Sequence, residues 1–204
     1  CNQSRTEFRE DIRHSKNLLE ELSGQKVIGY RAPSYSISRE TYWAFDELCE
    51  AGYRYDSSIF PVSHDLYGLK DWPRFPAQAV RSPDGQWRSN PSADPNLPSS
   101  LLEIPITTLN LGGRNLPIAG GGDFRLYPYF VTQWGLSRIN LTEKQPFVFY
   151  LHPWEIDPGQ PRMSGAKLKS RVRHYLNLDK TEPRFNRLLN DFKFRKISEI
   201  PDLC

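Results

Sequence analysis

Long apolar runs are missing from this sequence. No stretch approaches the roughly 20 apolar residues that a membrane-spanning helix requires, and none has the pattern of a secretory signal peptide. Cysteine is also scarce. Cys1, Cys49 and Cys204 are too few and too scattered for a disulfide framework or a zinc site, so we expect a reducing compartment or buried thiols.

Methionine and an excess of one charge are lacking as well. The only methionine is Met163, so residue 1 is not expected to be a natural start, and a targeting segment or a further domain upstream would not be visible. The 27 basic residues are nearly balanced by 24 acidic residues. This balance gives no excess of positive charge that would indicate binding to nucleic acid or to a membrane surface.

Aromatic residues and prolines, by contrast, are abundant. Aromatic residues make up 13% of the chain, and the 17 prolines indicate many loops. Flat aromatic surfaces suit sugar rings, although packing in a core is their more common use. The length of 204 residues suffices for one domain, or for most of a larger one.

Helix and strand signals alternate along the first part of the chain. A capping-box pattern at residues 4–7 begins a helix over about residues 5–22. A strand at 27–33, a second helix at 39–51 and a strand at 53–58 follow. This order predicts parallel strands joined by crossovers, and therefore an α/β fold.

The following part is less regular. Prolines interrupt residues 63–100, which we interpret as a surface excursion, either a substrate-side loop or a variable insertion. The glycines at 120–122 lack the spacing of a phosphate loop, so they predict a tight turn. Further elements are expected at 101–105 (strand), 128–140 (helix), 181–192 (helix) and 194–197 (strand).

Residues 147–151 form a run of five apolar or aromatic residues that ends at His152. The run is too short for a helix and rich in β-formers, which predicts a strand buried on both faces of a parallel sheet. Pro153 then ends the strand, because proline has no N–H to donate to a neighbouring strand. Because α/β folds keep their chemistry at the carboxyl ends of such strands, His152 is the first candidate site residue.

Arg31 and Asp56 occupy the ends of two other predicted strands. In a barrel-like sheet, these residues and His152 converge on one rim. The carboxylate would then fix the arginine, while the histidine transfers a proton near neutral pH. Each residue alone is equally compatible with a surface ion pair or a strand-end cap.

Three motifs resemble those of the NodB-homology polysaccharide deacetylases: GYRAPS at 29–34, YDSS at 55–58 and YLHPWE at 150–155. Residues 157–162 and 173–178 resemble the subgroup encoded beside exosortase-linked exopolysaccharide genes. The similarity runs through essentially the whole chain. It implies an irregular, incomplete β/α barrel that removes acetyl groups from N-acetylated sugars with the help of a divalent metal, usually zinc.

The resemblance implies three catalytic residues. Arg31 matches the arginine that orients the catalytic base, and His152 matches the general acid that protonates the leaving amine. Asp56 resembles the acid that pairs with the arginine, although Ser58 and Ile59 replace the usual Asp-Trp that follows.

The resemblance also implies residues that bind substrate. Leu151 matches the wall of the acetyl-methyl pocket, and Pro33 shapes the groove beside the arginine. Ser34 stands where the family often has tyrosine; its backbone amide would help to hold the oxyanion, which does not depend on the side chain. Tyr35 and Trp154 complete the expected substrate-binding set.

The family's metal-binding motifs do not occur in this sequence. His14 is the only histidine among the 30 residues before Arg31, so no metal ligands are expected within residues 1–204. We therefore expect the carboxyl-terminal part of a deacetylase, a barrel that lacks its first strands, with little or no activity alone. Residues 1–160 would form the barrel part, and residues 161–204 a family-specific extension packed on the same domain.

The expected partner is an N-acetylated polysaccharide or oligosaccharide in bacterial exopolysaccharide biosynthesis, in the cytoplasm or at the cell envelope, with the cytoplasm favoured. A non-catalytic carbohydrate-binding or assembly protein is the alternative. A barrel glycoside hydrolase would need two carboxylates, for which Glu103, Glu155 and Asp157 are available. The Arg31 and His152 motifs favour amide hydrolysis over that reaction.

Overall fold

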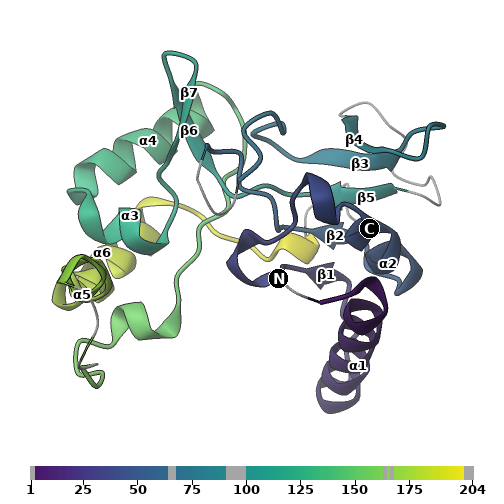
Figure 1. Ribbon diagram of the computed structural model, residues 1–204. Helices are drawn as coiled ribbons and strands as arrows, with labels where there is room; N and C mark the ends of the chain where they lie inside the picture. Colours follow the sequence, from purple (N-terminus) through teal and green to yellow (C-terminus); the bar gives the residue numbers. More distant parts are fainter. Residues whose placement is uncertain (1–2, 64–67, 91–99, 163–164, 166–167, 200–204) are drawn as a thin grey trace. The chain divides into compact units, whose positions relative to one another are not determined.

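The computed structural model in Figure 1 divides into two compact units, which are described in turn. The first unit comprises residues 1–106 and 196–204, and the second comprises residues 107–195. The predicted extension over residues 161–204 stays a prediction. The structure describes residues 3–63, 68–90, 100–162, 165 and 168–199.

The first unit is built on a five-stranded sheet with the strand order β1-β2-β5-β3-β4. The strands β1 (Gly29–Tyr30), β2 (Tyr55–Asp56) and β5 (Ser100–Glu103) are parallel, which confirms the predicted crossovers. The mixed α/β class is confirmed, but the barrel is not. The sheet is open, with β1 and β4 at its edges, and the described residues form no closed barrel.

A hairpin of β3 (Ala77–Arg81) and β4 (Trp87–Asn90) completes this sheet, with β3 antiparallel to β5. The irregular excursion predicted for residues 63–100 is therefore wrong for this part. Ala77, Ala79 and Trp87 are buried, so packing in the core stabilises the hairpin. The frequent prolines in this part of the sequence made its strand pattern difficult to recognise. Residues 64–67 and 91–99 lie outside the described residues.

The helix α1 (Arg5–Ser23) confirms the first predicted helix. Ser4 and Glu7 form the capping box, and Gly24 ends the helix in the left-handed conformation with φ 65°. Its buried face packs against α2 (Trp43–Glu50), which follows a 3₁₀ turn. Between these helices, the fully buried Glu47 accepts hydrogen bonds from two arginines of α1.

The second unit combines a hairpin with four helices. Gly112 and Gly113, with φ 57° and 80°, form the tight turn between the hairpin strands. The hairpin strands are β6 (Thr108–Leu111) and β7 (Arg114–Pro117), and the helices are α3 (Gly121–Leu126), α4 (Tyr129–Leu141), α5 (Leu168–Tyr175) and α6 (Leu178–Asp191). The predicted helices at 128–140 and 181–192 are confirmed by α4 and α6.

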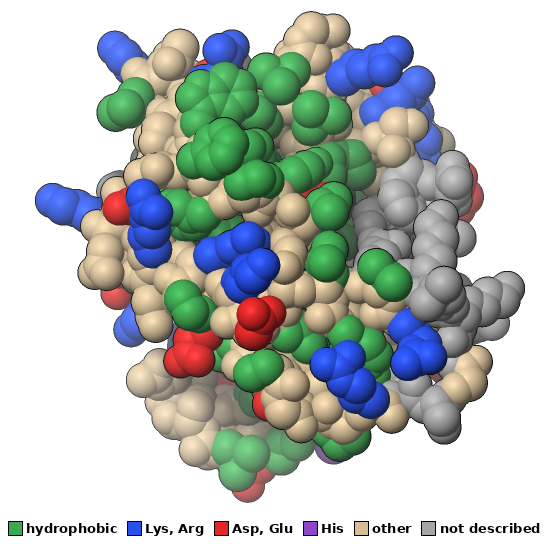
Figure 2. Space-filling model, turned by 90° about the vertical axis from the view of Figure 1, so that its left-hand side faces the viewer, with side chains coloured by type: hydrophobic (Ala, Val, Ile, Leu, Met, Phe, Trp, Pro, Cys, Tyr) green, Lys and Arg blue, Asp and Glu red, His purple; other side chains and the backbone are tan. Residues whose placement is uncertain are grey.

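The helix α4 is apolar on two faces. It buries Leu136 and Ile139, yet leaves Phe130 and Trp134 exposed, at 69% and 50%. Figure 2 shows hydrophobic side chains gathered in the upper part of the face seen from the side of α3 to α6, with Lys and Arg among them. None of the helices within the described ranges has the length and apolar character needed to cross a bilayer.

Residues 147–151 do not form the predicted buried strand. Only Tyr150 pairs, through a single parallel bridge to Gly120, and the run is half-buried. The prediction is wrong because the aromatic rings pack against helices instead of neighbouring strands: Phe149 lies against Phe124 of α3 and Phe185 of α6. The strand predicted at 194–197 is also absent from this described stretch, where a 3₁₀ turn, Ile197–Glu199, begins instead.

Candidate functional site

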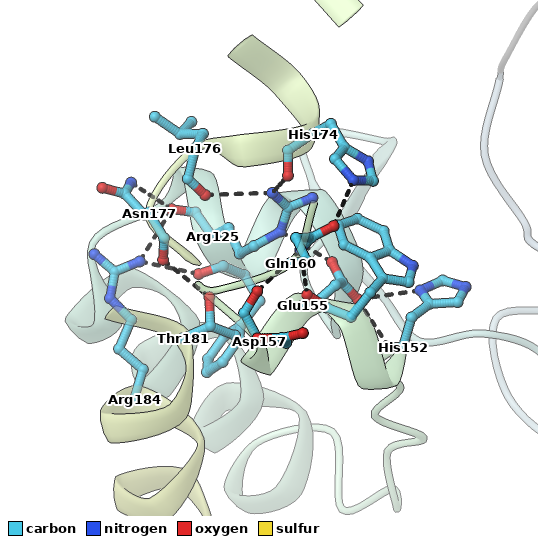
Figure 3. Close-up of polar contacts among 12 residues, drawn as sticks. Arg125, His152, Glu155, Asp157, Gln160, His174, Leu176, Asn177, Thr181 and Arg184 are labelled. Carbon is cyan, nitrogen blue, oxygen red and sulfur yellow. Dashed lines mark hydrogen bonds and ion pairs between the residues drawn. The ribbon is translucent and has the colours of Figure 1, made fainter. Parts of the chain in front are cut away.

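His152 lies at the start of a 3₁₀ turn, Pro153–Ile156, and is held there by Glu155 (Figure 3). The backbone N–H of His152 donates to Oε2 of Glu155 at 2.9 Å, and Nδ1 of its ring lies 3.1 Å from the same oxygen. The His152 side chain is 57% exposed, whereas Glu155 is 1% exposed. Pro at the first position of the turn and Glu at the third are local signals that favour this geometry.

The carboxylate determines which ring nitrogen of His152 exchanges protons. Because Glu155 only accepts hydrogen bonds when ionised, Nδ1 must carry a hydrogen and donate it. The remaining nitrogen, Nε2, is then the atom that takes or gives a proton. An exposed imidazole with a buried carboxylate behind it has the arrangement of a general acid-base group.

Arg125 of α3 holds the other oxygen of this carboxylate. Its Nε donates to Oε1 of Glu155 at 2.9 Å, and both side chains are almost fully buried. Its Nη1 donates to the backbone oxygens of His174 at 2.7 Å and Leu176 at 3.3 Å. Glu155 therefore bridges His152 to a buried guanidinium, which satisfies the carboxylate where water cannot.

Sequence reasoning missed this role of Arg125 and considered Glu155 as one of the carboxylates available to a glycoside hydrolase. No motif marks Arg125, which follows a glycine run and lies 30 positions before its partner. Glu155 carried a usable signal, the three-residue spacing of a capping box behind His152.

Trp154 packs between two imidazole rings. It stacks on His174 with centroids 4.2 Å apart and on His152 with centroids 5.7 Å apart. Gln160 donates to the backbone oxygens of Trp154 and Asp157, so its Oε1 faces Nε2 of His174 at 2.9 Å. The expected substrate-binding residue Trp154 thus forms part of the packing behind His152, and Leu151 is half-buried.

In the first unit, Arg31 binds Ser57. Its Nε donates to the Ser57 backbone oxygen at 2.9 Å, and Nη2 donates to Oγ of Ser57 at 2.7 Å. The predicted pairing of Arg31 with Asp56 is wrong. Tyr30 is the register partner of Asp56, and successive residues of a strand point to opposite faces, so Arg31 falls beside Ser57.

Asp56 is instead the neighbour of Glu103 on β5, and both are fully buried. Asp56 accepts a hydrogen bond from Oγ of Ser58 at 2.6 Å, whereas its Oδ2 and Oε2 of Glu103 have no hydrogen-bond partner among the described residues. Burial raises the pKa of both groups, and the nearby charge of Asp56 raises the pKa of Glu103 further, well above its ordinary value. A proton carried by Oε2 of Glu103 can be donated to Oδ2 of Asp56. Both of these buried oxygens would then take part in a hydrogen bond, which neither has among the other described groups.

The turn after Arg31 is conformationally unusual. Ser34 and Tyr35 both have left-handed backbones, with φ 56° and 52°, which non-glycine residues rarely adopt. Such backbone strain clusters at functional positions. Arg31 and Pro33 also line a cavity of about 360 Å³ whose wall includes the aromatic rings of Phe8, Tyr30 and Trp43.

The comparisons with known proteins give one match. A family model described as a domain of unknown function, DUF3473, matches residues 57–202. The chain belongs to the DUF3473 family. No curated protein and no solved structure matches it.

The DUF3473 match includes the whole His152 network and Glu103, whereas Arg31 and Asp56 precede it. The candidate residues thus fall into two sets. The first unit carries Arg31, Pro33, Ser34, Tyr35 and Asp56, and the second carries Leu151, His152 and Trp154.

The described residues of this DUF3473 protein do not fit a metal ion. No group of three or more His, Cys, Asp or Glu within the described ranges has the geometry to hold one. His14 is exposed on α1 and belongs to no group of this kind among the described residues. The metal that the resemblance implies therefore has no set of ligands among the described residues.

Proposed function

We propose that this chain supplies the proton-donating part of an enzyme that removes acetyl groups from an N-acetylated polysaccharide in exopolysaccharide biosynthesis. The observation that carries the proposal is the exposed His152 ring backed by the buried pair of Glu155 and Arg125. The DUF3473 family is associated with polysaccharide deacetylases. The NodB-like motifs around Arg31 and His152 support the same reaction class.

The proton on Nε2 of His152 has a defined task in this reaction. Water adds to the acetamide carbonyl, and the resulting tetrahedral species collapses by breaking the carbon–nitrogen bond. The departing nitrogen must gain a proton, and His152 gives it from Nε2 while Glu155 stabilises the ring at Nδ1. The products are acetate and a free amino sugar.

The resemblance to the NodB-homology deacetylases also gives Arg31 and Ser34 of the first unit a part in this reaction class. Arg31 is held by Ser57 next to the turn of Pro33 and Ser34.

Glycoside hydrolysis is less well supported. Glu103 is fully buried against Asp56, and Glu155 is buried against Arg125. Neither carboxyl group is exposed to reach a glycosidic bond, which that reaction requires of two carboxyl groups. A non-catalytic carbohydrate-binding protein remains the alternative, favoured by the aromatic wall of the 360 Å³ cavity.

The test is acetate release from N-acetylglucosamine oligomers by the full-length gene product with zinc added. His152→Ala should lower turnover by about 10²- to 10⁴-fold. His14→Ala, at an exposed histidine of α1, is the matched control and should not change it. Residues 1–204 alone should release little or no acetate. Equal turnover with and without His152, or sugar binding without any acetate release, contradicts the proposed deacetylase.

A further inference from the structure

Positive charge is concentrated in one segment of the otherwise balanced chain. Residues 158–178 contain no Asp or Glu and five basic residues: Arg162, Lys167, Lys169, Arg171 and Arg173. A local excess of this kind attracts anionic groups, even where the whole protein is close to neutral.

Two of these arginines meet at one hollow of the second unit. The hollow has a volume of about 320 Å³ and is lined by Arg162, Arg171, Val172, Tyr175 and Leu176. Both arginines are exposed, and the Arg162 guanidinium lies 4.7 Å from the centre of the Tyr175 ring. Neither arginine forms an ion pair with an acidic side chain in the described part of the chain. Their charges are therefore available to a ligand.

A row of stacked or contacting rings connects this hollow to the proton donor. Tyr175 contacts His174 with ring centroids 4.6 Å apart, His174 stacks on Trp154 at 4.2 Å, and Trp154 stacks on His152 at 5.7 Å. The hollow and His152 thus lie at the two ends of one packed side-chain row within a single unit. A polymer bound at one end is positioned with respect to the other.

We infer that this hollow is a subsite for an anionic sugar residue, a uronate, of the polysaccharide substrate. Guanidinium groups bind carboxylates through two parallel hydrogen bonds, and the apolar side chains of Val172 and Leu176 suit the face of a pyranose ring. The inference rests on the proposed function, since it takes the partner to be a carbohydrate. A small, shallow hollow with two arginines, rather than an extended basic stripe, favours a sugar carboxylate over a nucleic-acid backbone.

The test measures binding of a galacturonate hexamer by isothermal titration calorimetry with the full chain at low salt. Arg162→Ala combined with Arg171→Ala should weaken binding by about 10- to 100-fold. Arg162→Lys combined with Arg171→Lys keeps both positive charges but loses the planar guanidinium groups. This variant should weaken binding less than the double Ala variant does. Arg114→Ala combined with Lys193→Ala removes two exposed basic residues outside the hollow and is the charge-matched control, which should bind like the wild type.

Two further measurements make the outcome decisive. His152→Ala should bind the galacturonate hexamer normally, so a failed deacetylase assay and a failed binding assay are distinguishable. A hexamer of N-acetylglucosamine should not respond to loss of the two arginines. Absence of galacturonate binding, equal binding by the double Ala variant, or tighter binding of single-stranded DNA of equal charge overturns the subsite.

Discussion

Oε2 of Glu155 accepts both the backbone N–H and the ring Nδ1–H of His152, at 2.9 Å and 3.1 Å. One oxygen thus fixes the main chain and the imidazole together. The other oxygen of the carboxylate is held by Arg125, so the orientation of His152 depends on a residue of α3.

Replacing Glu155 by Gln should retain the fold but lower deacetylation. The Gln oxygen can still accept from Arg125, while its NH₂ group then meets Nδ1 and the backbone N–H of His152, which favours the wrong tautomer. We expect a rate loss of about 10²- to 10⁴-fold in the acetate-release assay. Glu182→Gln, at an exposed position of α6, is the control. Unchanged turnover of Glu155→Gln would show that the carboxylate has no part in orienting His152.

Replacing Arg125 by Met should destabilise the second unit. Its loss leaves the Glu155 carboxylate buried without its partner and frees the carbonyls of His174 and Leu176, at a cost of about 3–5 kcal/mol. Adding Glu155→Met should recover part of this loss in urea unfolding. Arg138→Met, which breaks a 4.0 Å surface ion pair, should change stability by less than about 1 kcal/mol. Strict additivity of the two core substitutions would exclude the coupling.

Replacing Gly120 by Ala should loosen the segment that leads to His152. Gly120 has φ 133°, and an added Cβ would lie 2.0 Å from the Tyr150 backbone oxygen. We expect a destabilisation of about 2 kcal/mol or more, measured by urea unfolding. Gly122→Ala is the control, because its φ is ordinary and the nearest atom is 3.9 Å away. Equal stability of the two variants would rule out the bridge as a constraint.

The buried pair of Asp56 and Glu103 should make the first unit less stable as pH rises. Burial and the charge of Asp56 raise the pKa of Glu103 in the folded state. At a pH above the ordinary pKa of a carboxyl group, the folded protein therefore still holds a proton that the unfolded chain has released. The stability is therefore fully present below the unfolded pKa and is lost as pH rises toward the folded pKa. The expected slope is roughly 1 kcal/mol per pH unit for one proton.

Glu103→Gln tests this pair. The amide donates to Asp56 and accepts from the backbone N–H of Ile59, as the protonated acid does. Urea unfolding from about pH 5 to about pH 8 should therefore show a flatter pH dependence for the variant than for the wild type. Glu40→Gln, at an exposed residue, should keep the wild-type slope. Parallel curves for Glu103→Gln and the wild type would refute the shared proton.

Local residue patterns alone determined much of the secondary structure. The capping box at Ser4 and the stop at Gly24 define α1, and the amphipathic pattern of α6 was sufficient for its prediction. These signals act between residues a few positions apart, through hydrogen bonds that the adjacent chain satisfies. The parallel order of β1 and β2 followed from the helix between them.

Only the tertiary structure decided which side chains are partners. The register that aligns Tyr30 with Asp56 places Arg31 against Ser57, and a shift of one residue would have reversed the faces. Arg125 reaches Glu155 because α3 packs beside the turn after His152. The sequence predicts His152 as the proton donor. The folded chain determines what holds its ring, because buried charges pair with the groups that lie near them in space, whatever their distance along the chain.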